Sequence, residues 1–377
     1  MKLIHLSDLH LGKRVNGFSM LKDQEYILDE ILSIIDVECP DAVLIAGDIY
    51  DKSIPPAEAV DLLDFFLVEL VKRELPVFII SGNHDSADRL SFASQLIERS
   101  KVYISTKYTG AVSPITLEDK YGPVDFFLLP FIKPVHVRQT FPELCVENYT
   151  DAVVGAIAHM HINPERRNVL VTHQFVVGAT RCESEEISVG GSDSVAHSVF
   201  APFDYVALGH IHGPQNIKDS RIRYSGSPLK YSFSETKHRK SATIVELGAK
   251  GALVVRQIPF TPLRDMIELK GSYNELTAQA FYEDLDTNAY VHVTLTDEQD
   301  VPDAISKLRV VYPNLMRLDY DNNRTRACGN ILKVGDAVQQ SPLDLFKSFY
   351  QQQNNTSLSV QQEEYLTQMI ENVWGQQ

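Results

Sequence analysis

Five short apolar runs, each followed at once by polar residues, constrain the fold of this chain more than any other feature. The runs are Leu3-Ile4, Val43-Leu44-Ile45-Ala46, Val77-Phe78-Ile79-Ile80, Val169-Leu170-Val171 and Tyr205-Val206-Ala207-Leu208. Short, β-rich runs bounded by polar or glycine residues are typical of buried strands. We therefore expect an α/β fold in which polar side chains at the carboxyl ends of these strands point into one crevice.

The polar motifs after the runs carry side chains that bind metals. They are Asp8-Leu9-His10, Gly47-Asp48, Gly82-Asn83-His84-Asp85, His173 and Gly209-His210-Ile211-His212. Apart from Asp85, these motifs supply two acids, one amide and four or five imidazoles, which suit two divalent cations of borderline hardness held side by side. A lone Asp-x-His is a weak signal, but five such motifs at strand ends are hard to produce by accident. The sequence therefore predicts a centre for two metals.

Metal-assisted hydrolysis is the chemistry that this set of residues predicts. A carboxylate such as Asp48 can bridge two cations, which two-metal sites hold roughly 3.5–4 Å apart. Water bound to such a cation ionises near neutral pH, so that no serine or cysteine nucleophile is required. An imidazole that is not a ligand can protonate the leaving oxygen. His84 is the candidate, and we expect Asp85 to hold its ring in one tautomer.

Composition places the chain among soluble globular proteins. Its 377 residues are too many for one typical core, so we expect two or three domains. No segment is apolar for about 18 residues and the N-terminus shows no signal-peptide pattern, which predicts a cytoplasmic protein without a membrane span. The cysteines at positions 39, 145, 182 and 328 form no CxxC pair, and this usage fits a reducing compartment.

The net charge of −15 argues against simple electrostatic capture of nucleic acid. The charge is uneven, however, because residues 211–240 hold seven Lys or Arg against two acids. Two interpretations of this basic stretch remain open. It could hold phosphates beside the predicted metals, or it could be a solvated hairpin.

Residues 1–262 alternate strand-like runs with helical patterns and form the predicted catalytic domain. The best helix runs over about 56–74, and its apolar residues cover more than one face. The surplus apolar residues Leu62, Phe65 and Phe66 have two interpretations that the sequence leaves open. They could lie in a deeper core, or they could form a homodimer contact. Residues 178–195 are predicted to form a long loop, either functional or a spacer.

Two smaller regions follow the catalytic domain. Residues 263–334 show a β-α-β-α-β order, which predicts a small α+β domain. We expect its strands over 266–269, 290–295 and 315–318, and its helices over about 274–285 and 302–311. Its segment 264–330 is acidic, with twelve Asp or Glu against seven Lys or Arg. Residues 335–377 predict two amphipathic tail helices. Their apolar anchors include Phe346, Phe349, Leu366, Met369 and Trp374. Such a tail is a docking element for a partner or a helical hairpin that folds back on its own protein.

The motifs resemble those of a known family. The five motifs look like those of the calcineurin-like metallophosphoesterases. Within that superfamily the whole chain resembles the SbcD family, and this closer resemblance rests on segments 4–12, 46–51, 81–86, 207–212 and 224–228. SbcD proteins are nuclease subunits of bacterial SbcCD complexes. The resemblance implies a two-sheet α/β metallophosphoesterase sandwich, a small α+β capping domain and a C-terminal helical tail.

The resemblance also implies a role for each residue of the predicted centre. One metal would be held by Asp8, His10, Asp48 and His212. The other would be held by Asp48, Asn83, His173 and His210. His84 would contact the scissile phosphate and assist the leaving oxygen, with Asp85 supporting it. The metals would be two Mn²⁺ ions, with Mg²⁺ as the alternative.

Family members cut duplex DNA ends 3′ to 5′ and cut hairpins and single strands endonucleolytically. The resemblance therefore implies a manganese-dependent DNA nuclease in end processing, repair and recombination. It implies a homodimer bound to an SMC-like ATPase, SbcC, in a heterotetramer whose coiled coil the tail would grip. This chain has no Gly-x-x-x-x-Gly-Lys-Ser/Thr loop, so ATP dependence must come from that partner. The acidic capping domain departs from the expectation of direct DNA contact, and the candidate DNA-binding residues are Lys13, Arg14, Arg89, Arg221 and Arg223.

Two other functions compete with the nuclease. A related phosphoesterase could act on phosphoprotein, nucleotide or lipid, but phosphoprotein phosphatases of this superfamily typically carry Asp-Arg-Gly where this chain has Asp51-Lys52-Ser53. The other rival is a non-catalytic scaffold for the ATPase. The complete ligand set and the His84-Asp85 pair argue against a scaffold.

Overall fold

The computed structural model describes residues 1–185 and 193–323, positions 325, 343, 346, 347 and 350, and residues 358–374. Among the predicted docking anchors, Phe349 lies outside the described residues, and so does the side chain of Trp374. The predicted boundary between residues 334 and 335 and most of the first tail helix also lie outside them.

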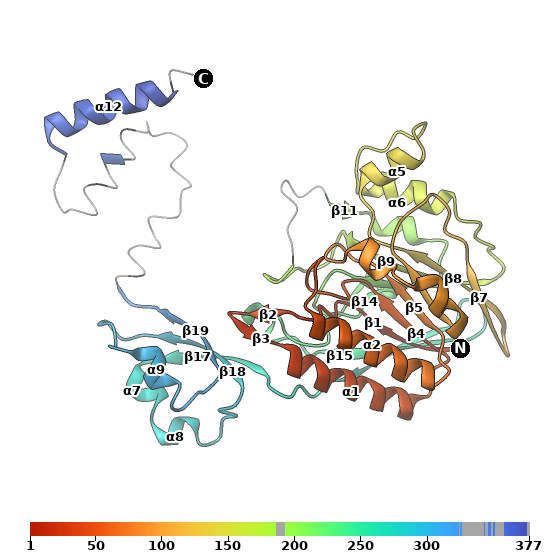
Figure 1. Cartoon of the computed structure of the whole chain (residues 1–377), viewed down its shortest axis with the longest axis horizontal. Coiled ribbons are helices and arrows are strands. Elements are labelled where there is room, and N and C mark those ends of the chain that lie inside the picture. Colours follow the sequence, from red (N-terminus) through yellow and green to blue (C-terminus); the bar gives the residue numbers. More distant parts are fainter. Residues whose placement is uncertain are drawn as a thin grey trace.

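Two six-stranded sheets form the predicted catalytic domain (Figure 1). The first has the order β16-β15-β1-β4-β5-β6, with strands β1 Lys2–Leu6, β4 Ala42–Ala46, β5 Val77–Ile80, β6 Val102–Ser105, β15 Ser241–Leu247 and β16 Leu253–Pro259. The second has the order β13-β14-β12-β9-β8-β7, with strands β7 Ile115–Asp119, β8 Gly122–Leu129, β9 Arg167–His173, β12 Tyr205–Gly209, β13 Gln215–Ile217 and β14 Asp219–Tyr224. The five predicted strands are β1, β4, β5, β9 and β12, which confirms that part of the α/β prediction.

The strands are buried on both faces, and side chains alternate between two layers of core. On β4, Val43 and Ile45 face the helices. Ala42, Leu44 and Ala46 face the second sheet, where they meet side chains such as Phe126 and Val171. Because successive side chains of a strand point to opposite faces, a strand with helices on one side and a sheet on the other is apolar throughout.

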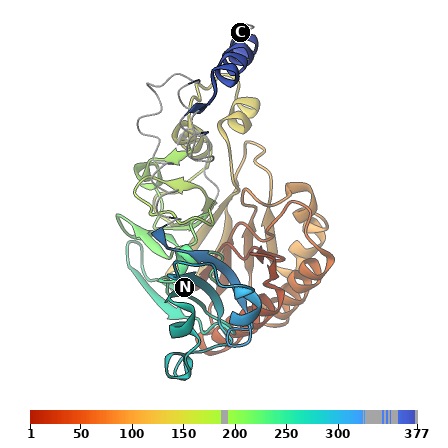
Figure 2. The same ribbon diagram turned by 90° about the vertical axis from the view of Figure 1, so that its left-hand side faces the viewer.

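Helices cover the outer face of each sheet. The first sheet packs against α1 Leu21–Glu38 and α2 Ala57–Lys72, and the second packs against α5 Pro134–Thr140 and α6 Tyr149–Ala158. Figure 2 shows the red-to-orange helices on one side of the molecule and the yellow-to-green part on the other. The remaining elements of this domain are short: β2 Arg14–Val15, β3 Phe18–Ser19, α3 Ala87–Leu90, α4 Ser94–Ile97, β10 Phe175–Val176, β11 Ser194–Val195 and the 3₁₀ turns Glu98–Ser100, His197–Phe200 and Phe233–Glu235.

The strand directions bring the polar motifs to one edge of the sandwich. Strand β4 pairs in parallel with β1 and β5, and β12 pairs in parallel with β9. Across the two sheets, Gly209 at the end of β12 packs against the backbone of Ala46 at the end of β4. The carboxyl ends of all five strands therefore meet, as the sequence predicts.

Strand β9 ends in the polar residue His173, and the alternation of its buried side chains between the two faces continues up to that residue. Val169 and Val171 face the first sheet, whereas Leu170 faces the helices. His173 is two residues beyond Val171, so that period two places its imidazole between the two sheets. It is fully buried there.

The small domain, here called the cap, holds a parallel sheet of three strands (Figure 1, at the end of the catalytic domain where β2 and β3 are labelled). Its elements are β17 Met266–Gly271, α7 Tyr273–Leu276, α8 Gln279–Tyr282, β18 Tyr290–Leu295, α9 Ala304–Leu308 and β19 Leu315–Tyr320. The strand expectations are confirmed. The single helix expected over about 274–285 is wrong, because Thr277 and Ala278 separate two short helices.

The cap is attached to α1 by a buried ion pair. Arg264 donates two hydrogen bonds to the Asp23 carboxylate, at 3.0 and 2.6 Å. The hydroxyl of Tyr290 donates to the same carboxylate at 2.7 Å. Asp23 is fully buried, so these partners supply the hydrogen bonds that a buried carboxylate requires.

The second tail helix is α12 Val360–Trp374. It is drawn apart from the two large sheets in Figure 1. Of the predicted docking anchors, Met369 is exposed and Phe346 is 40% exposed, while Leu366 is partly buried. Among the described residues, no helix is both long and apolar enough to cross a membrane.

Helix α2 resolves the two interpretations of its surplus apolar residues. Leu62 and Phe66 are buried in the core, so their prediction as homodimer contacts is wrong. Phe65 is 44% exposed, and its neighbours Val60 and Val68 are each 43% exposed. Val60 and Val68 line an apolar groove of about 520 Å³, which Phe92 borders on the side of α3.

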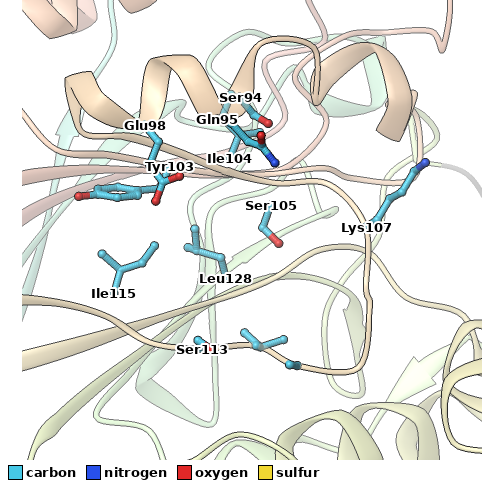
Figure 3. A pocket seen from close by; sticks show the side chains of 12 residues that line it. Ser94, Gln95, Glu98, Tyr103, Ile104, Ser105, Lys107, Ser113, Ile115 and Leu128 are labelled. Carbon is cyan, nitrogen blue, oxygen red and sulfur yellow. The ribbon is translucent and has the colours of Figure 1, made fainter.

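A second cavity lies between the edge strands of the two sheets (Figure 3). It has a volume of about 350 Å³ and is bordered by α4, β6, β7 and β8. Its polar lining includes Glu98, Tyr103, Ser105 and Lys107. No predicted metal ligand lines it, so it is separate from the edge where the polar motifs meet.

Candidate metal centre

Hydrogen bonds that extend the β1–β4 pairing position the first two motifs side by side. The amide of Asp8 donates to the carbonyl of Gly47 at 3.0 Å, and the amide of His10 donates to that of Asp48 at 2.9 Å. Asp8, His10 and Asp48 all have positive φ, at 54°, 45° and 51°. His210 joins them with a φ of 100°. Such backbone conformations are sparsely populated for residues other than glycine and are concentrated at functional sites.

Glycines allow the motifs to approach one another. A Cβ on Gly209 would overlap the carbonyl oxygen of Ala46 and lie 2.7 Å from Nδ1 of His173. A Cβ on Gly47 would lie 2.5 Å from the same Nδ1. A Cβ on Gly82 would overlap the carboxylate of Asp48. Each of the three motif glycines is therefore required by close packing at the sheet edges.

One group of side chains gathers around His10 and His212. Their Nε2 atoms lie 3.1 Å apart, and Nε2 of His10 lies 3.6 Å from Oδ2 of Asp48. The carboxylate of Asp8 belongs to the same cluster of donor atoms. It is fixed by the amide of His210, which donates to it at 3.0 Å.

A second group gathers around Asn83. Its Oδ1 lies 3.1 Å from Nε2 of His173 and 3.0 Å from Nδ1 of His210. Nε2 of His173 also lies 3.3 Å from Oδ2 of Asp48. The same oxygen of Asp48 therefore faces both groups, which is the position that a bridging carboxylate requires. The structure brings all seven predicted ligands together.

The residues present fit divalent cations. Asp8 and Asp48 are buried side by side, and such a pair requires positive charge nearby. Burial lowers the pKa of His210 to about 3 and that of His10 well below its usual value, so both imidazoles have a free lone pair. Burial alone would lower the pKa of His173, but the charges of Asp48 and Asp8 outweigh it and raise the pKa to about 9. In the metal-free protein, His173 therefore carries a proton in the position where the surrounding oxygen and nitrogen atoms would bind a cation.

Comparison with known proteins identifies the family. Residues 1–214 match the model of the calcineurin-like phosphoesterases, and residues 262–354 match the model described as the type 5 capsule protein repressor C-terminal domain, SbcD_C. Two relatives carry the name of the D subunit of the nuclease SbcCD. The protein from Staphylococcus saprophyticus is 38% identical over 322 residues, 84% of each chain. That from Staphylococcus epidermidis is 33% identical over 377 residues, 98% of each chain. The chain belongs to the SbcD family of calcineurin-like phosphoesterases.

Solved structures similar to this chain include two that are less than 15% identical to it. The protein TT1561 of Thermus thermophilus is 12% identical with a TM-score of 0.40, and covers 68% of this chain and 98% of its own. A dimetal phosphatase from Danio rerio is 13% identical with a TM-score of 0.38, and covers 68% of this chain and 95% of its own.

In this SbcD-family chain His84 and Asp85 both contact the main chain. Nδ1 of His84 lies 3.0 Å from the carbonyl oxygen of Asp51, so it donates to the main chain. The carboxylate of Asp85 instead accepts from the amides of Ile49 at 3.1 Å, Tyr50 at 2.9 Å and Gly82 at 2.9 Å. These contacts of Asp85 are with main-chain amides, and its role in orienting the ring of His84 stays a prediction. Asp85 fastens the two ligand loops to each other.

The residues that support His212 were not predicted from the sequence. Its Nδ1 lies 2.8 Å from the hydroxyl of Ser184 and 3.4 Å from Glu235, which is fully buried. Glu235 is paired in turn with Lys240, and the amide of His212 donates to Glu185 at 2.7 Å. Carboxylates in this position orient a metal-binding imidazole and raise its basicity. The spacing from His212 to Glu235 carries no local sequence signal.

A glutamine on α1 was also missed. The side-chain amide of Gln24 donates to the carbonyl of His10 at 2.7 Å, and its oxygen accepts from Gly12 at 2.9 Å. It therefore holds the turn that carries the first motif. Here a signal existed, because Gln24 lies on the same stripe of α1 as the buried Ile27 and Ile31. A polar residue on an apolar stripe marks a buried hydrogen-bonding partner.

The predicted DNA-binding residues do not share one environment. Arg223 is buried, and donates to Thr243 at 3.2 Å and Asn216 at 2.6 Å, so its prediction as a DNA contact is wrong. Lys13 is mostly buried and pairs with Asp51 at 2.7 Å. The other three, Arg14, Arg89 and Arg221, are exposed, and Arg221 pairs with Asp219.

Proposed function

We propose that this SbcD-family chain is a manganese-dependent DNA nuclease. It would act as a 3′–5′ exonuclease on duplex ends and as an endonuclease on hairpins and single strands. The observation that carries the proposal is the meeting of seven ligating side chains and His84 at one edge of the two sheets. The two staphylococcal relatives, both named as nuclease subunits, support DNA as the substrate.

Two divalent cations would complete the centre. Asp8, His10, Asp48 and His212 would hold one cation, and Asp48, Asn83, His173 and His210 the other. Mixed nitrogen and oxygen donors suit Mn²⁺, with Mg²⁺ as the alternative. When bound, such a pair polarises the phosphodiester and makes water a nucleophile at neutral pH. Because the buried acids and imidazoles are fixed by backbone hydrogen bonds, the chain holds this geometry without rearrangement.

His84 is the proposed general acid. Its ring lies 4.9 Å from that of His10, centroid to centroid, so it borders the first group of ligands. Because Nδ1 donates to the carbonyl of Asp51, Nε2 is the atom that can pass a proton to the leaving oxygen. The amide of His84 donates to Oδ1 of Asp48 at 3.0 Å, which fixes the position of the proposed general acid relative to the proposed bridging carboxylate.

Space for the substrate lies beside the second group of ligands. A pocket of about 110 Å³ is lined by Asn83 and His210 together with Phe131, Phe175 and Lys133. Aromatic rings and a cation next to a metal centre suit a nucleotide, because bases stack on aromatic faces and phosphates pair with lysine.

Partners follow from the surfaces that the chain leaves exposed. We propose that the apolar groove on α2 and α3 is covered by a second copy of this chain, and that α12 docks on an SMC-like ATPase of the SbcC type. ATP would be hydrolysed by that partner in a cytoplasmic heterotetramer. The match of residues 262–354 to the SbcD_C model supports the same assignment.

Cleavage of linear duplex and hairpin DNA by the purified chain, with and without Mn²⁺, tests the proposal. A small phosphodiester serves as a substrate that needs no DNA-binding surface, and His84→Ala is the matched inactive variant. Cutting of both DNA substrates that depends on metal and on His84 is the expected result. Hydrolysis of the diester alone, also after addition of the SMC-like ATPase, would contradict DNA as the substrate. Retained ATPase binding with no hydrolysis of any substrate would indicate a scaffold.

A further inference from the structure

A pocket lies where the cap leaves the catalytic domain. Its volume is about 480 Å³, and it is lined by the loop 236–240, by Lys230 and by the linker 259–266. Six of its lining residues are basic or imidazole side chains: Lys230, Lys237, His238, Arg239, Lys240 and Arg264. Pockets at domain junctions are common ligand sites. This one is unusually basic for a chain with a net charge of −15.

Three of these cations already have structural partners. Lys240 is paired with the buried Glu235, and Lys230 lies 2.7 Å from Asp265. Arg264 is held by Asp23 on α1. Their charges are neutralised locally and hold the pocket wall together, so they contribute little attraction for a ligand.

Lys237 and Arg239 are different. Both are exposed, and within residues 1–185 and 193–323 neither forms an ion pair. They are two residues apart on one loop, with His238 between them. Burial and then the charge of Lys240 lower the pKa of His238, so this ring adds no charge at neutral pH. The pocket therefore presents two uncompensated cations to solvent.

The loop that carries these two cations is rigidly connected to the metal centre. Nζ of Lys240 donates to the carbonyl of His212 at 2.8 Å, and Nζ of Lys230 donates to the carbonyl of Thr236 at 2.8 Å. The amide of His238 donates to the carbonyl of Glu235 at 2.8 Å. Both ends of the loop are thus fixed to the backbone and to the residues that support a predicted ligand. A ligand held by this loop has a defined position relative to the site of cleavage.

We propose that Lys237 and Arg239 bind the phosphodiester backbone of the DNA strand that passes from the metal centre to the root of the cap. This inference rests on the proposed nuclease function and extends it. Phosphate contacts from lysine and arginine fix the position of a duplex without reading its sequence. The proposal also accounts for the acidic cap, because the phosphates are held at its root and not on its acidic surface.

The test measures DNA affinity against salt concentration in the His84→Ala background, which keeps the DNA intact in the presence of Mn²⁺. The test variant adds Lys237→Ala and Arg239→Ala. The matched control adds Lys101→Ala and Lys120→Ala, which remove the same charge from exposed positions just before β6 and β8, at the strand ends opposite the metal centre. Calorimetric Mn²⁺ titration verifies that the centre is intact in each protein.

We expect the test variant to bind DNA more weakly whatever the DNA sequence. The slope of log affinity against log salt concentration should decrease in magnitude by about 2, about 1 for each lost phosphate contact. The control keeps the slope of its parent. An unchanged slope in the test variant would overturn the proposal.

Lys237 and Arg239 could bind phosphate groups of DNA or a free phosphate-containing anion. Titration with pyrophosphate distinguishes the two: pyrophosphate binding that the test variant loses, with DNA binding unchanged, would indicate a small-anion site and overturn the proposal. Hydrolysis of the small diester by the wild-type chain, together with no DNA binding by the His84→Ala parent, would overturn the proposed DNA substrate itself, and this inference with it.

Discussion

Nδ1 of His84 lies 3.0 Å from the carbonyl oxygen of Asp51, so that the main chain holds one ring nitrogen of the proposed general acid. The carbonyl belongs to the same loop as Asp48, the carboxylate that faces both groups of ligands. One loop therefore fixes the proposed bridging carboxylate and the proposed proton donor together. Preorganisation of this kind lets the two groups act on one phosphate without a conformational step.

His84→Ala is expected to lower kcat by about 10²–10⁴-fold, the usual contribution of a positioned acid, while Mn²⁺ affinity is retained. Asp51→Ala keeps the carbonyl that holds the ring, so we expect a loss of less than about tenfold. Steady-state kinetics on the small diester, with Mn²⁺ affinity from calorimetry, checks both variants. The carboxylate of Asp51 also lies 3.8 Å from Nδ1 of His10, so Mn²⁺ affinity separates the two roles. A loss for Asp51→Ala as large as that for His84→Ala, with Mn²⁺ affinity retained, would show that the side chain of Asp51 orients the ring instead.

Asp85→Ala should act mainly on stability. It leaves the amides of Ile49, Tyr50 and Gly82 without their acceptor, and a buried donor left unsatisfied costs about 1–3 kcal/mol. We expect the free energy of unfolding to fall by about 2–4 kcal/mol, and Mn²⁺ affinity to fall with it. Asp85→Asn retains one acceptor oxygen and serves as the control with a smaller loss. An Asp85→Ala protein as stable as wild type, but inactive, would indicate that Asp85 acts by orienting His84.

Gly209→Ala should abolish metal binding. The added Cβ overlaps the carbonyl of Ala46 and presses on His173, so the ends of β12 and β4 must move apart. Gly155→Ala on α6 is the matched control, since its Cβ meets only the flexible ends of Leu144 and Val137, at 3.3 and 3.4 Å. Replacing glycine by alanine within a helix usually stabilises by roughly 0.5–1 kcal/mol. Equal Mn²⁺ affinities of the two variants would contradict the close packing at the sheet ends.

Metal affinity should rise with pH. In the metal-free protein the carboxylates of Asp48 and Asp8 raise the pKa of His173 to about 9. Nδ1 donates to the carbonyl of Ala46 at 2.8 Å, so the proton that titrates is on Nε2, where a cation would bind. Below about pH 9 metal must displace that proton, and affinity should fall by about tenfold for each pH unit.

Calorimetry of Mn²⁺ binding in buffers of different ionisation enthalpy checks this prediction. Release of about one proton for each His173 site is expected at pH 7, and less as the pH approaches 9. Affinity that is independent of pH, with no proton release, would contradict the protonated state of His173.

The groove on α2 predicts a homodimer. Phe65→Ser with Val68→Ser makes two exposed apolar positions beside the groove polar, and we expect monomers by sedimentation velocity with unchanged thermal stability, because both side chains are over 40% exposed. Val154→Ser with Val310→Ser is the control, as it removes exposed apolar side chains elsewhere. A dimer that persists in the first variant and dissociates in the second would place the interface outside α2.

The positions of the strands were predictable because a strand that is buried on both faces appears in the sequence as a continuous apolar run. Runs such as Val43–Ala46 and Val77–Ile80 are apolar throughout, and the structure forms β4 and β5 there. The helix expected over about 274–285 failed because the local pattern did not show the break at Thr277 and Ala278. Contacts of the cap decide this position, and a weak helical preference cannot override them.

The sequence by itself determined the fold class and the candidate ligands, because strand burial and strand-end motifs are local patterns. Only the tertiary structure decided what supports them. Glu235 reaches His212, Asp85 fastens two loops, and Arg223 is buried, each through contacts between residues far apart in the chain. Such contacts depend on how the two sheets pack against each other. The spacing of residues along the chain does not show which of them the packing brings together.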